Sequence, residues 1–387
     1  MRFPEFSGEW NKYTINDLAT VVGGGTPDTT VKSYWGGDIQ WFTPSEIGKN
    51  KYVDFSKRTI TRDGLDNSSA KLLPLHTILL SSRATVGECS IASNECTTNQ
   101  GFQSLIAKQC NIDFLYYLIQ TKKKDLIRNA CGSTFLEISA NEIRKIKVAV
   151  PVQNEQEQIA KLLSLIDERI ATQNKIIDKL KSLIKGLPHK MAEIGLQKGC
   201  WEKVLLSTVL VERKELNSEL YTVHSVSVSE GVINQIEYLG RSFAAKDTSN
   251  YHVARYGDII YTKSPTGDFP YGIVKQSYIE QPVAISPLYG VYSPTSFETG
   301  VYLHYYFMSS VLAKNYLYPL IQKGAKNTIN ISNQRFLENR IALPLKQTDR
   351  HNIARALITI QKKLDIEKCA MDSLTKQRSY LLQQLFI

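Results

Sequence analysis

Several patterns in this sequence have residue types suited to bond-making chemistry, and none of them is complete. Glu212, Arg213 and Lys214 have the E-x-K order of a metal-dependent nuclease site, but no Pro-Asp pair precedes them at a reasonable distance. The glycine run at 23–25 lacks the Lys-Ser/Thr of a phosphate-binding loop. The six histidines form no H-x-x-x-H or H-E-x-x-H pattern, and G-x-S-x-G is absent. The sequence therefore predicts no catalytic site, no metal and no cofactor.

The cysteines and the charge point away from a redox or metal protein and toward a polyanionic partner. Six scattered cysteines contain no C-x-x-C pair, which disfavours both a zinc site and a disulfide framework. The net charge is +10, from 47 Lys and Arg against 37 Asp and Glu, and suits a polyanion. Residues 1–150 carry +3, 151–195 +1, 196–345 +2 and 346–387 +4, so folding must assemble any nucleic-acid surface.

Length and hydropathy predict a multidomain cytoplasmic protein. A chain of 387 residues is too long for one ordinary core. The longest apolar runs, at 77–80 and 146–152, fall far short of the roughly 20 residues that cross a bilayer. The first six residues contain an acid and a proline where a signal peptide needs a continuous apolar stretch. We therefore expect no membrane association.

The elements that would position functional residues occur twice, because the sequence contains an internal repeat. The Gly-x-Trp at 8–10 returns at 199–201, and the apolar stretch ending in proline at 147–151 returns at 340–344. From Ile159 and Ile353 onward the offset is 194. Between these anchors the offset wanders, with 79–81 matching 259–261 and 115–117 matching 303–305. A shared frame with diverged interiors suggests two copies of one recognition device with different targets.

Each copy ends in a long amphipathic helix whose apolar residues recur every 3.5 residues. One polar residue, Gln173 or Glu367, occupies the equivalent step of each seam. The seam residues are Ile159, Leu163, Ile166, Ile170, Ile177, Leu180 and Ile184 in the first copy, and Ile353, Leu357, Ile360, Leu364, Met371, Leu374 and Leu381 in the second. Such a stripe is unstable alone, so we expect the two helices to pair. Pro188 predicts that the first helix ends or kinks near 186–188.

The segments before each helix predict mixed α/β domains. Short β-rich runs at 39–42, 77–81, 103–107 and 146–150 alternate with turn clusters, and a helix is expected near 112–124. The second copy repeats this with a strand at 257–261 and a helix at 302–310. We therefore expect the chain to divide into parts at 1–150, 151–195, 196–345 and 346–387.

Several motifs together resemble a known family. They are GGTP at 24–27, YWGGDI at 34–39, WFTP at 41–44, SSAKLLP at 68–74, LSSRATVG at 80–87, TNQGF at 98–102, and VP at 150–151 followed by EQ at 155–156. These residues resemble the specificity (S) subunits of type I restriction-modification systems. The resemblance covers nearly the whole chain and is strongest in the first half.

The resemblance implies an α/β (α+β) fold with two globular target recognition domains, at 1–150 and 196–345, separated by an antiparallel coiled coil. The central conserved spacer helix would be 151–195 and the distal one 346–387, related by an internal pseudo-two-fold repeat. Each domain would read one half of a bipartite double-stranded DNA target, and helix length would set the unread spacer. Two modification (methyltransferase) subunits would dock along the helices, restriction (translocase-nuclease) subunits would join them, and the chain itself would be non-catalytic.

Candidate DNA-reading residues follow from the side chains that hydrogen-bond to bases and phosphates from loops. The first choices lie after equivalent strands and are Ser82, Arg83 and Thr85 in the first copy and Lys263, Ser264 and Thr266 in the second. The second choices are Thr26, Thr43, Lys49, Asn99 and Gln100, with Ser133, Thr134, Lys326 and Asn327 in the paired glycine turns. The second copy has YTKSPTG at 261–267 where the first has SSRATVG at 81–87, which argues for an asymmetric target.

Two other functions remain open at this point. A recognition fragment of a stand-alone restriction enzyme or methyltransferase would need N/D-P-P-Y/F, Walker A or P-D…E-x-K patterns, and these are absent. A coiled-coil adaptor that binds only proteins would explain the helices but gives the duplicated, diverged domains no purpose.

Overall fold

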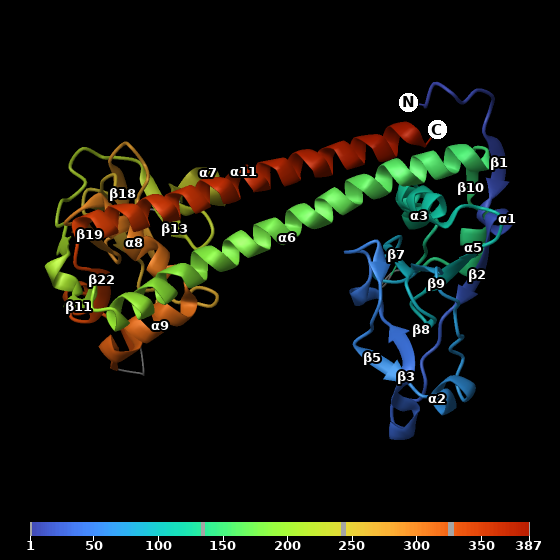
Figure 1. Cartoon of the computed structure of the whole chain (residues 1–387), viewed down its shortest axis with the longest axis horizontal. Helices are drawn as coiled ribbons and strands as arrows, with labels where there is room; N and C mark the ends of the chain where they lie inside the picture. The colour runs from blue at the N-terminus through green and yellow to red at the C-terminus, as the bar shows by residue number, and fades with distance from the viewer. Residues whose placement is uncertain (1, 133–135, 241–244, 324–328, 387) are drawn as a thin grey trace. The chain divides into compact units, whose positions relative to one another are not determined.

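The computed structural model describes residues 2–132, 136–240, 245–323 and 329–386. The chain forms two compact units (Figure 1): unit 1 comprises residues 1–173 and 370–387, and unit 2 comprises 174–369. Two long helices, α6 (Gln153–Gln197) and α11 (Gln347–Leu385), each contribute to both units.

The strands described in unit 1 form three small sheets. In the first, β1 (Asn11–Thr14) pairs antiparallel with β10 (Lys147–Val150). Another has the order β2-β9-β6-β7-β4, with β2 (Ala19–Gly23), β9 (Gln103–Ala107), β6 (Ile78–Leu80), β7 (Cys89–Ala92) and β4 (Tyr52–Val53). The third has the order β5-β3-β8, with β5 (Arg58–Ile60), β3 (Trp35–Phe42) and β8 (Cys96–Thr98). Short helices connect them: α1 (Ile15–Leu18), α2 (Arg62–Asp66), α3 (Ile112–Thr121), α4 (Lys123–Arg128) and α5 (Ala140–Lys145).

Helix α3 lies at the centre of the main core of unit 1. It begins where the Asn111 side chain accepts a hydrogen bond from the Phe114 N–H, 3.0 Å away. Its apolar side chains, including fully buried Phe114 and Tyr117, share one hydrophobic cluster with the start of α6 and the end of α11. The sequence predicted one helix near 112–124, but the chain breaks into α3 and α4 because Lys122 leaves helical geometry, with ψ near 6°.

Unit 2 repeats this plan. One sheet pairs β11 (Trp201–Leu205) with β22 (Arg340–Pro344). A second has the order β12-β19-β16-β17, with β12 (Leu210–Glu212), β19 (Gly290–Pro294), β16 (Ile259–Tyr261) and β17 (Val274–Gln276). Another has the order β14-β13-β18-β15, with β14 (Gly231–Asn234), β13 (Val223–Ser227), β18 (Val283–Ile285) and β15 (His252–Ala254). The remaining elements are α7 (Gln235–Leu239), α8 (Phe297–Phe307), α9 (Ser310–Leu317), α10 (Asn333–Phe336), β20 (Gln322–Lys323) and β21 (Ile329–Asn330).

The strand orders confirm the internal repeat. The order β2-β9-β6-β7 of unit 1 corresponds to β12-β19-β16-β17 of unit 2. Residues 79–81 and 259–261 are therefore equivalent in the repeat, as the sequence predicted. Each unit also has a sheet in which a parallel pair, β3 with β8 or β13 with β18, is flanked by an antiparallel strand. The helix expected at 302–310 begins earlier, at Phe297, because Ser296 caps it by accepting a hydrogen bond from the Thr299 N–H.

The long helices bury the predicted seams, and the mixed α/β fold class with paired helices is confirmed. Within unit 1 the end of α11 lies beside the start of α6 (Figure 1), and Leu381 and Leu385 share a core with Ile159 and Leu163, so the helices run antiparallel there. In unit 1, Ile159, Leu163, Ile166 and Leu381 are buried, and Ile170, Met371 and Leu374 are half-buried; in unit 2, Ile177, Ile184, Ile353, Leu357 and Leu364 are buried, and Leu180 and Ile360 are half-buried.

Pro188 does not end the first helix as the sequence suggested. Helix α6 continues through it to Gln197, so the expected end of the helix near 186–188 is wrong. A proline inside a helix removes one backbone hydrogen bond and crowds the carbonyl of the preceding turn, at a cost of about 3 kcal/mol, which tertiary packing can offset. Pro188 is itself buried among the side chains of unit 2. Among the described residues, no helix combines the length and apolar character needed to cross a membrane.

Two glycines of α6 give a matched test of this helix. A Cβ at Gly186 would meet no atom within 4 Å, whereas a Cβ at Gly195 would overlap the Trp201 ring. We expect Gly186→Ala to raise the free energy of unfolding by about 1 kcal/mol, because alanine is the better helix former. We expect Gly195→Ala to lower it by about 1–3 kcal/mol through overpacking. Urea unfolding of the two variants checks this, and equal effects would contradict the packing of Trp201 on α6.

Candidate nucleic-acid interface

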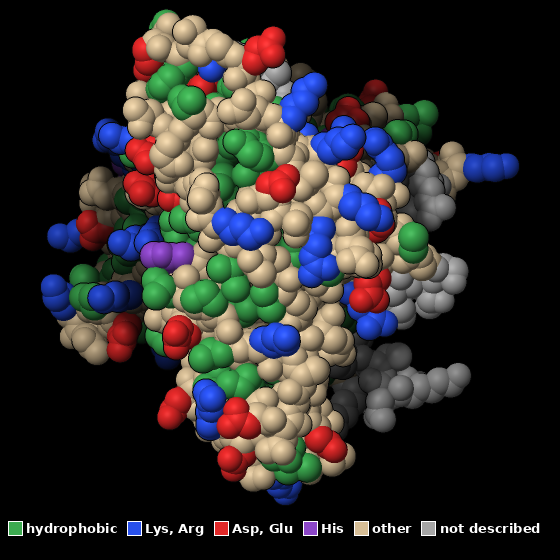
Figure 2. All heavy atoms as spheres, turned by 90° about the vertical axis from the view of Figure 1, so that its right-hand side faces the viewer, with side chains coloured by type: hydrophobic (Ala, Val, Ile, Leu, Met, Phe, Trp, Pro, Cys, Tyr) green, Lys and Arg blue, Asp and Glu red, His purple; other side chains and the backbone are tan. Residues whose placement is uncertain are grey.

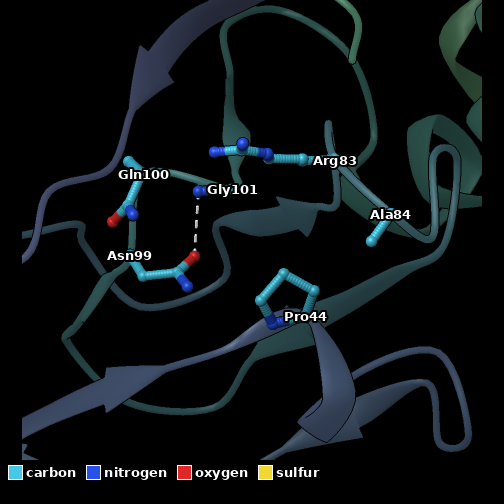
Figure 3. A pocket seen from close by; sticks show the side chains of 6 residues that line it. All are labelled: Pro44, Arg83, Ala84, Asn99, Gln100 and Gly101. Carbon is cyan, nitrogen blue, oxygen red and sulfur yellow. Dashed lines mark hydrogen bonds between the residues drawn. The ribbon is translucent and has the colours of Figure 1, made fainter. Parts of the chain in front are cut away.

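An open cleft of about 290 Å³ in unit 1 brings together three of the predicted DNA-reading residues, Arg83, Asn99 and Gln100. Figure 3 shows this cleft, whose other walls are Pro44, Ala84 and Gly101. The lining comes from three separate stretches of chain: the turn after β3, the loop after β6, and the loop between β8 and β9.

Backbone hydrogen bonds hold the loop after β6 in place. The Ser82 N–H donates to the Gly101 carbonyl over 2.9 Å, and the Ser82 carbonyl accepts from the Ile138 N–H over 2.9 Å. On the next loop, the Asn99 N–H donates to the Phe42 carbonyl over 3.1 Å. These bonds tie the walls of the cleft together and hold the loop that carries Arg83 in place.

A strained turn lies next to Arg83, whose side chain reaches into the cleft. Ala84 has φ near +64°, a region that non-glycine residues rarely occupy. The Thr85 N–H donates to the Arg83 carbonyl over 2.7 Å, and the Ser81 hydroxyl donates to the same carbonyl over 3.1 Å. In Figure 3 the Arg83 side chain extends across the cleft toward Gln100 and Gly101. Strain of this kind persists only where the surroundings enforce it, and it is concentrated at functional sites.

The ion pair between Arg83 and Glu137 is long and partly exposed. The Arg83 Nε lies 3.7 Å from the Glu137 Oε2, and the two side chains are 45% and 47% exposed. Exposed pairs of this kind contribute about 0–1 kcal/mol because water screens them. The guanidinium group therefore gives this cleft a positive charge near the surface.

The two amides of the cleft use their oxygens within the protein. The Asn99 Oδ1 accepts from the Gly101 N–H over 2.9 Å, which identifies the end of this carboxamide that faces the backbone. The Gln100 Oε1 accepts from the Thr26 hydroxyl. Thr26 is thus brought to the edge of the cleft, although it lies 74 residues away in sequence.

The other first-unit candidates lie elsewhere or are occupied structurally. Ser82 is fully buried, and its hydroxyl has no partner among the described residues. Thr43 donates its hydroxyl to the Glu46 carboxylate over 2.6 Å, capping the short 3₁₀ turn that begins at Pro44. The Thr85 hydroxyl lies 2.9 Å from that of Ser81, and Lys49 is exposed on a loop. Ser133 and Thr134 lie outside the described residues.

The equivalent loop of unit 2 has a different conformation. Lys263 has φ near +61° and is half-buried, and burial lowers its pKa against the opposing effect of Glu212. Two backbone hydrogen bonds of 3.0 Å join Thr266 to Phe269 and close a tight turn. Ser264 is exposed, and its carbonyl accepts from the Thr266 hydroxyl over 3.3 Å. Lys326 and Asn327 lie outside the described residues.

The E-x-K sequence at 212–214 has a structural role. Arg213 forms a bidentate ion pair with nearly buried Asp258, with hydrogen bonds of 2.6 and 3.0 Å. The Glu212 Oε1 accepts from the Asn333 amide over 2.6 Å. These bonds join β12 to the turn before β16 and to α10, as expected for residues that stabilise the domain.

One histidine and three cysteines have the shifted pKa values expected of core residues. Burial lowers the pKa of His304 to about 3, and its neutral ring accepts a hydrogen bond from the Gln276 N–H. Burial raises the pKa of Cys89, Cys96 and Cys110 to about 12, so their thiols stay protonated. Within the described ranges, no three His, Cys, Asp or Glu side chains cluster in a way that could hold a metal.

Basic side chains are not gathered into one block on the face of the molecule shown in Figure 2. Lys and Arg side chains are interspersed there with acidic and apolar ones. This agrees with the even spread of charge along the sequence.

Sequence reasoning missed four residues at or beside the cleft. Pro44, Ala84 and Gly101 line it, and Glu137 pairs with Arg83. The first three directly follow predicted residues in the sequence, so this proximity could have identified them. Glu137 is distant from Arg83 in sequence and approaches it through an isolated β-bridge, for which the sequence offers no pattern.

Sequence comparison relates the first half of the chain to one family. Residues 7–182 match a family described as the type I restriction modification DNA specificity domain. The MjaIX specificity subunit of Methanocaldococcus jannaschii is 39% identical over 183 residues, which is 44% of this chain and 42% of that protein. The EcoR124I/EcoR124II specificity subunit of Escherichia coli is 28% identical over 199 residues, which is 49% and 46% of the two chains. The chain thus spans less than half the length of these curated relatives.

Two solved structures share the fold over the whole chain. The S subunit of a type I restriction-modification system from M. genitalium superposes with a TM-score of 0.60 at 17% identity, covering 100% of this chain and 99% of that one. A chain from a study of type I restriction-modification complex assembly gives 0.57 at 13% identity, covering 99% and 98%. The resemblance inferred from the motifs is confirmed: residues 7–182 match the type I restriction modification DNA specificity domain, and the chain shares the fold of the S subunit throughout.

Proposed function

We propose that this chain is the DNA-sequence reader of a type I restriction-modification complex. The observation that carries the proposal is the match of residues 7–182 to a DNA specificity domain, in a chain whose second unit repeats the strand order of the first. Each unit would read one half of a bipartite target. Residues 1–150 and 196–345 would be the target recognition domains, and 151–195 and 346–387 the spacer helices.

The partners proposed for the chain follow from the same family. Two methyltransferase subunits would dock along α6 and α11, and translocase-nuclease subunits would join them. The chain would be the non-catalytic subunit, and it would work in the cytoplasm, where the host DNA lies. Exposed apolar side chains on the two helices, Leu165, Leu183 and Ile366, would be available for contacts with such subunits.

The cleft of unit 1 supplies the side chains for base readout. An arginine can donate two hydrogen bonds to the O6 and N7 of guanine, and a carboxamide can pair with adenine. Arg83, Asn99 and Gln100 meet in the cleft with Thr26 beside it, and Lys49 is exposed enough to contact a phosphate. We place Thr43, Ser82 and Thr85 behind them as residues that shape the loops.

The second unit would read a different half-site. Its candidates are Lys263, Ser264 and Thr266, with Lys326 and Asn327 as further choices. The half-buried lysine and closed turn present other donors than the exposed arginine of unit 1. This difference favours an asymmetric target. A protein-only adaptor and a fragment of a stand-alone enzyme are not favoured, since the matched domain is one for DNA specificity.

Methylome sequencing gives the direct test of this function. We expect a host that expresses the chain with its modification subunit to gain one split methylated motif, with two short specified parts around a fixed unread spacer. A host that expresses the modification subunit alone is the control. A complex that forms but adds no new motif would contradict DNA readout and favour the adaptor.

Arg83 gives a residue-level test. We expect Arg83→Ala to remove about 1–3 kcal/mol of discrimination at one base pair, as for a lost bidentate contact to guanine. Competition binding to duplexes that carry single base-pair changes measures this. Glu137→Ala is the matched control, because it removes the ion-pair partner but keeps the guanidinium group, and it should leave the preference unchanged. Equal weakening by Arg83→Ala on every duplex would instead indicate a phosphate contact.

A further inference from the structure

A partly buried polar cluster in unit 1 joins both long helices to the globular part. Arg378 of α11 donates through Nε to the Asp167 carboxylate of α6, and its Nη2 lies 3.4 Å from the second Asp167 oxygen. The same Nη2 donates to the Gln120 Oε1 of α3 over 3.0 Å. The Tyr117 hydroxyl of α3 donates to Asp167 over 2.7 Å. Three separate elements therefore meet at one ion pair.

A second set of contacts extends the cluster to the loop before β4. Lys51 lies 2.8 Å from the Asp113 carboxylate and donates to the Ser164 hydroxyl of α6 over 2.6 Å. Its ammonium group also lies 4.8 Å from the centre of the Tyr117 ring, and its side chain is only 9% exposed. The part of α6 around 164–167 is thus held from two sides.

The equivalent positions of the other copy carry different residues. With the offset of 194, Asp167 corresponds to Gln361 and Arg378 corresponds to Ile184. Ile184 is only 1% exposed and sits in an apolar seam. The helix pair therefore has an ion pair within unit 1, whereas the equivalent residues within unit 2 are a buried isoleucine and a glutamine that donates to Asp365 of its own helix over 2.8 Å.

A polar pair present in only one half of a helix pair can fix the register in which the two helices align. Apolar seams with a regular repeat tolerate sliding by whole turns, because each new position still buries side chains. A half-buried arginine and aspartate lose their partners when the helices slide, and an unpaired buried charge is costly. Polar residues at such positions are the best-attested devices for specifying one register.

We propose that Asp167 and Arg378, supported by Tyr117 and Gln120, are positioning residues that lock α11 in one register against α6. The lock acts within unit 1, where the end of α11 and the start of α6 share one core.

The variant that tests the lock replaces each residue of the ion pair by the residue at its equivalent position in the repeat. Asp167→Gln together with Arg378→Ile should remove the charges as a pair and leave a folded chain. Each single change should lower the melting temperature by roughly 3–10 °C, because it leaves one charge without its partner, and the double change should recover most of this loss. The matched control is Asp178→Gln with Lys181→Gln, which removes an exposed ion pair from the same helix.

The distance between two spin labels reports the register of α11 against α6 in the absence of DNA. Ala171 and Lys376 are exposed positions on α6 and α11 within unit 1, and each can carry a label once exposed Cys131, Cys200 and Cys369 are replaced by serine. We expect one narrow distance in the parent and in the control variant. The double variant should give a broadened distribution or one shifted by about 5 Å. A narrow, unchanged distance would overturn the lock.

Absence of any split motif for the parent chain would count against the proposed function, whereas the lock stands or falls on the spin-label distance.

Discussion

The apolar seams of α6 and α11 are the constraint on which the rest of the structure depends. Each helix has a regular stripe of leucine and isoleucine that is unstable in water unless other residues cover it. In unit 1 the cover comes from α3 and from the opposing helix, and Ile159, Leu163, Leu381 and Leu385 belong to a single core. The globular part and the helix ends are therefore one cooperative structure. A reading domain built this way has a defined orientation on its helix.

The frame of the molecule could be predicted from the sequence because it depends on periodic patterns. The 3.5-residue seam predicted both helices, and the repeated strings at 8–10 and 199–201 predicted two copies of one fold. The helix does not end at Pro188, because packing along the whole of α6 outweighs the local effect of one proline. The break between α3 and α4 at Lys122 and the start of α8 at Phe297 were also missed. Caps and backbone breaks depend on single hydrogen bonds, which a sequence pattern does not reveal.

The candidate site could be predicted only in part. Arg83, Asn99 and Gln100 were selected for their side-chain chemistry, and the structure brings them to one cleft. Ser82 and Thr43 have equally suitable chemistry, yet one is buried and the other caps a turn. Composition cannot separate these cases, because the direction of a side chain depends on contacts such as the one between Ser82 and Gly101. Which of these residues contact DNA stays a prediction.

The position of Leu381 and Leu385 in the core of unit 1 has a consequence for synthesis on the ribosome. The rest of that core lies between Ile15 and Ile166, but these two leucines are translated only after the whole of unit 2, 174–369. At about 5–20 residues per second, the nascent unit waits roughly 10–40 s with its helix seam uncovered. During this interval the chain offers apolar surface to chaperones and to other nascent chains. Slow synthesis of the second half would therefore harm the first half, which is already made.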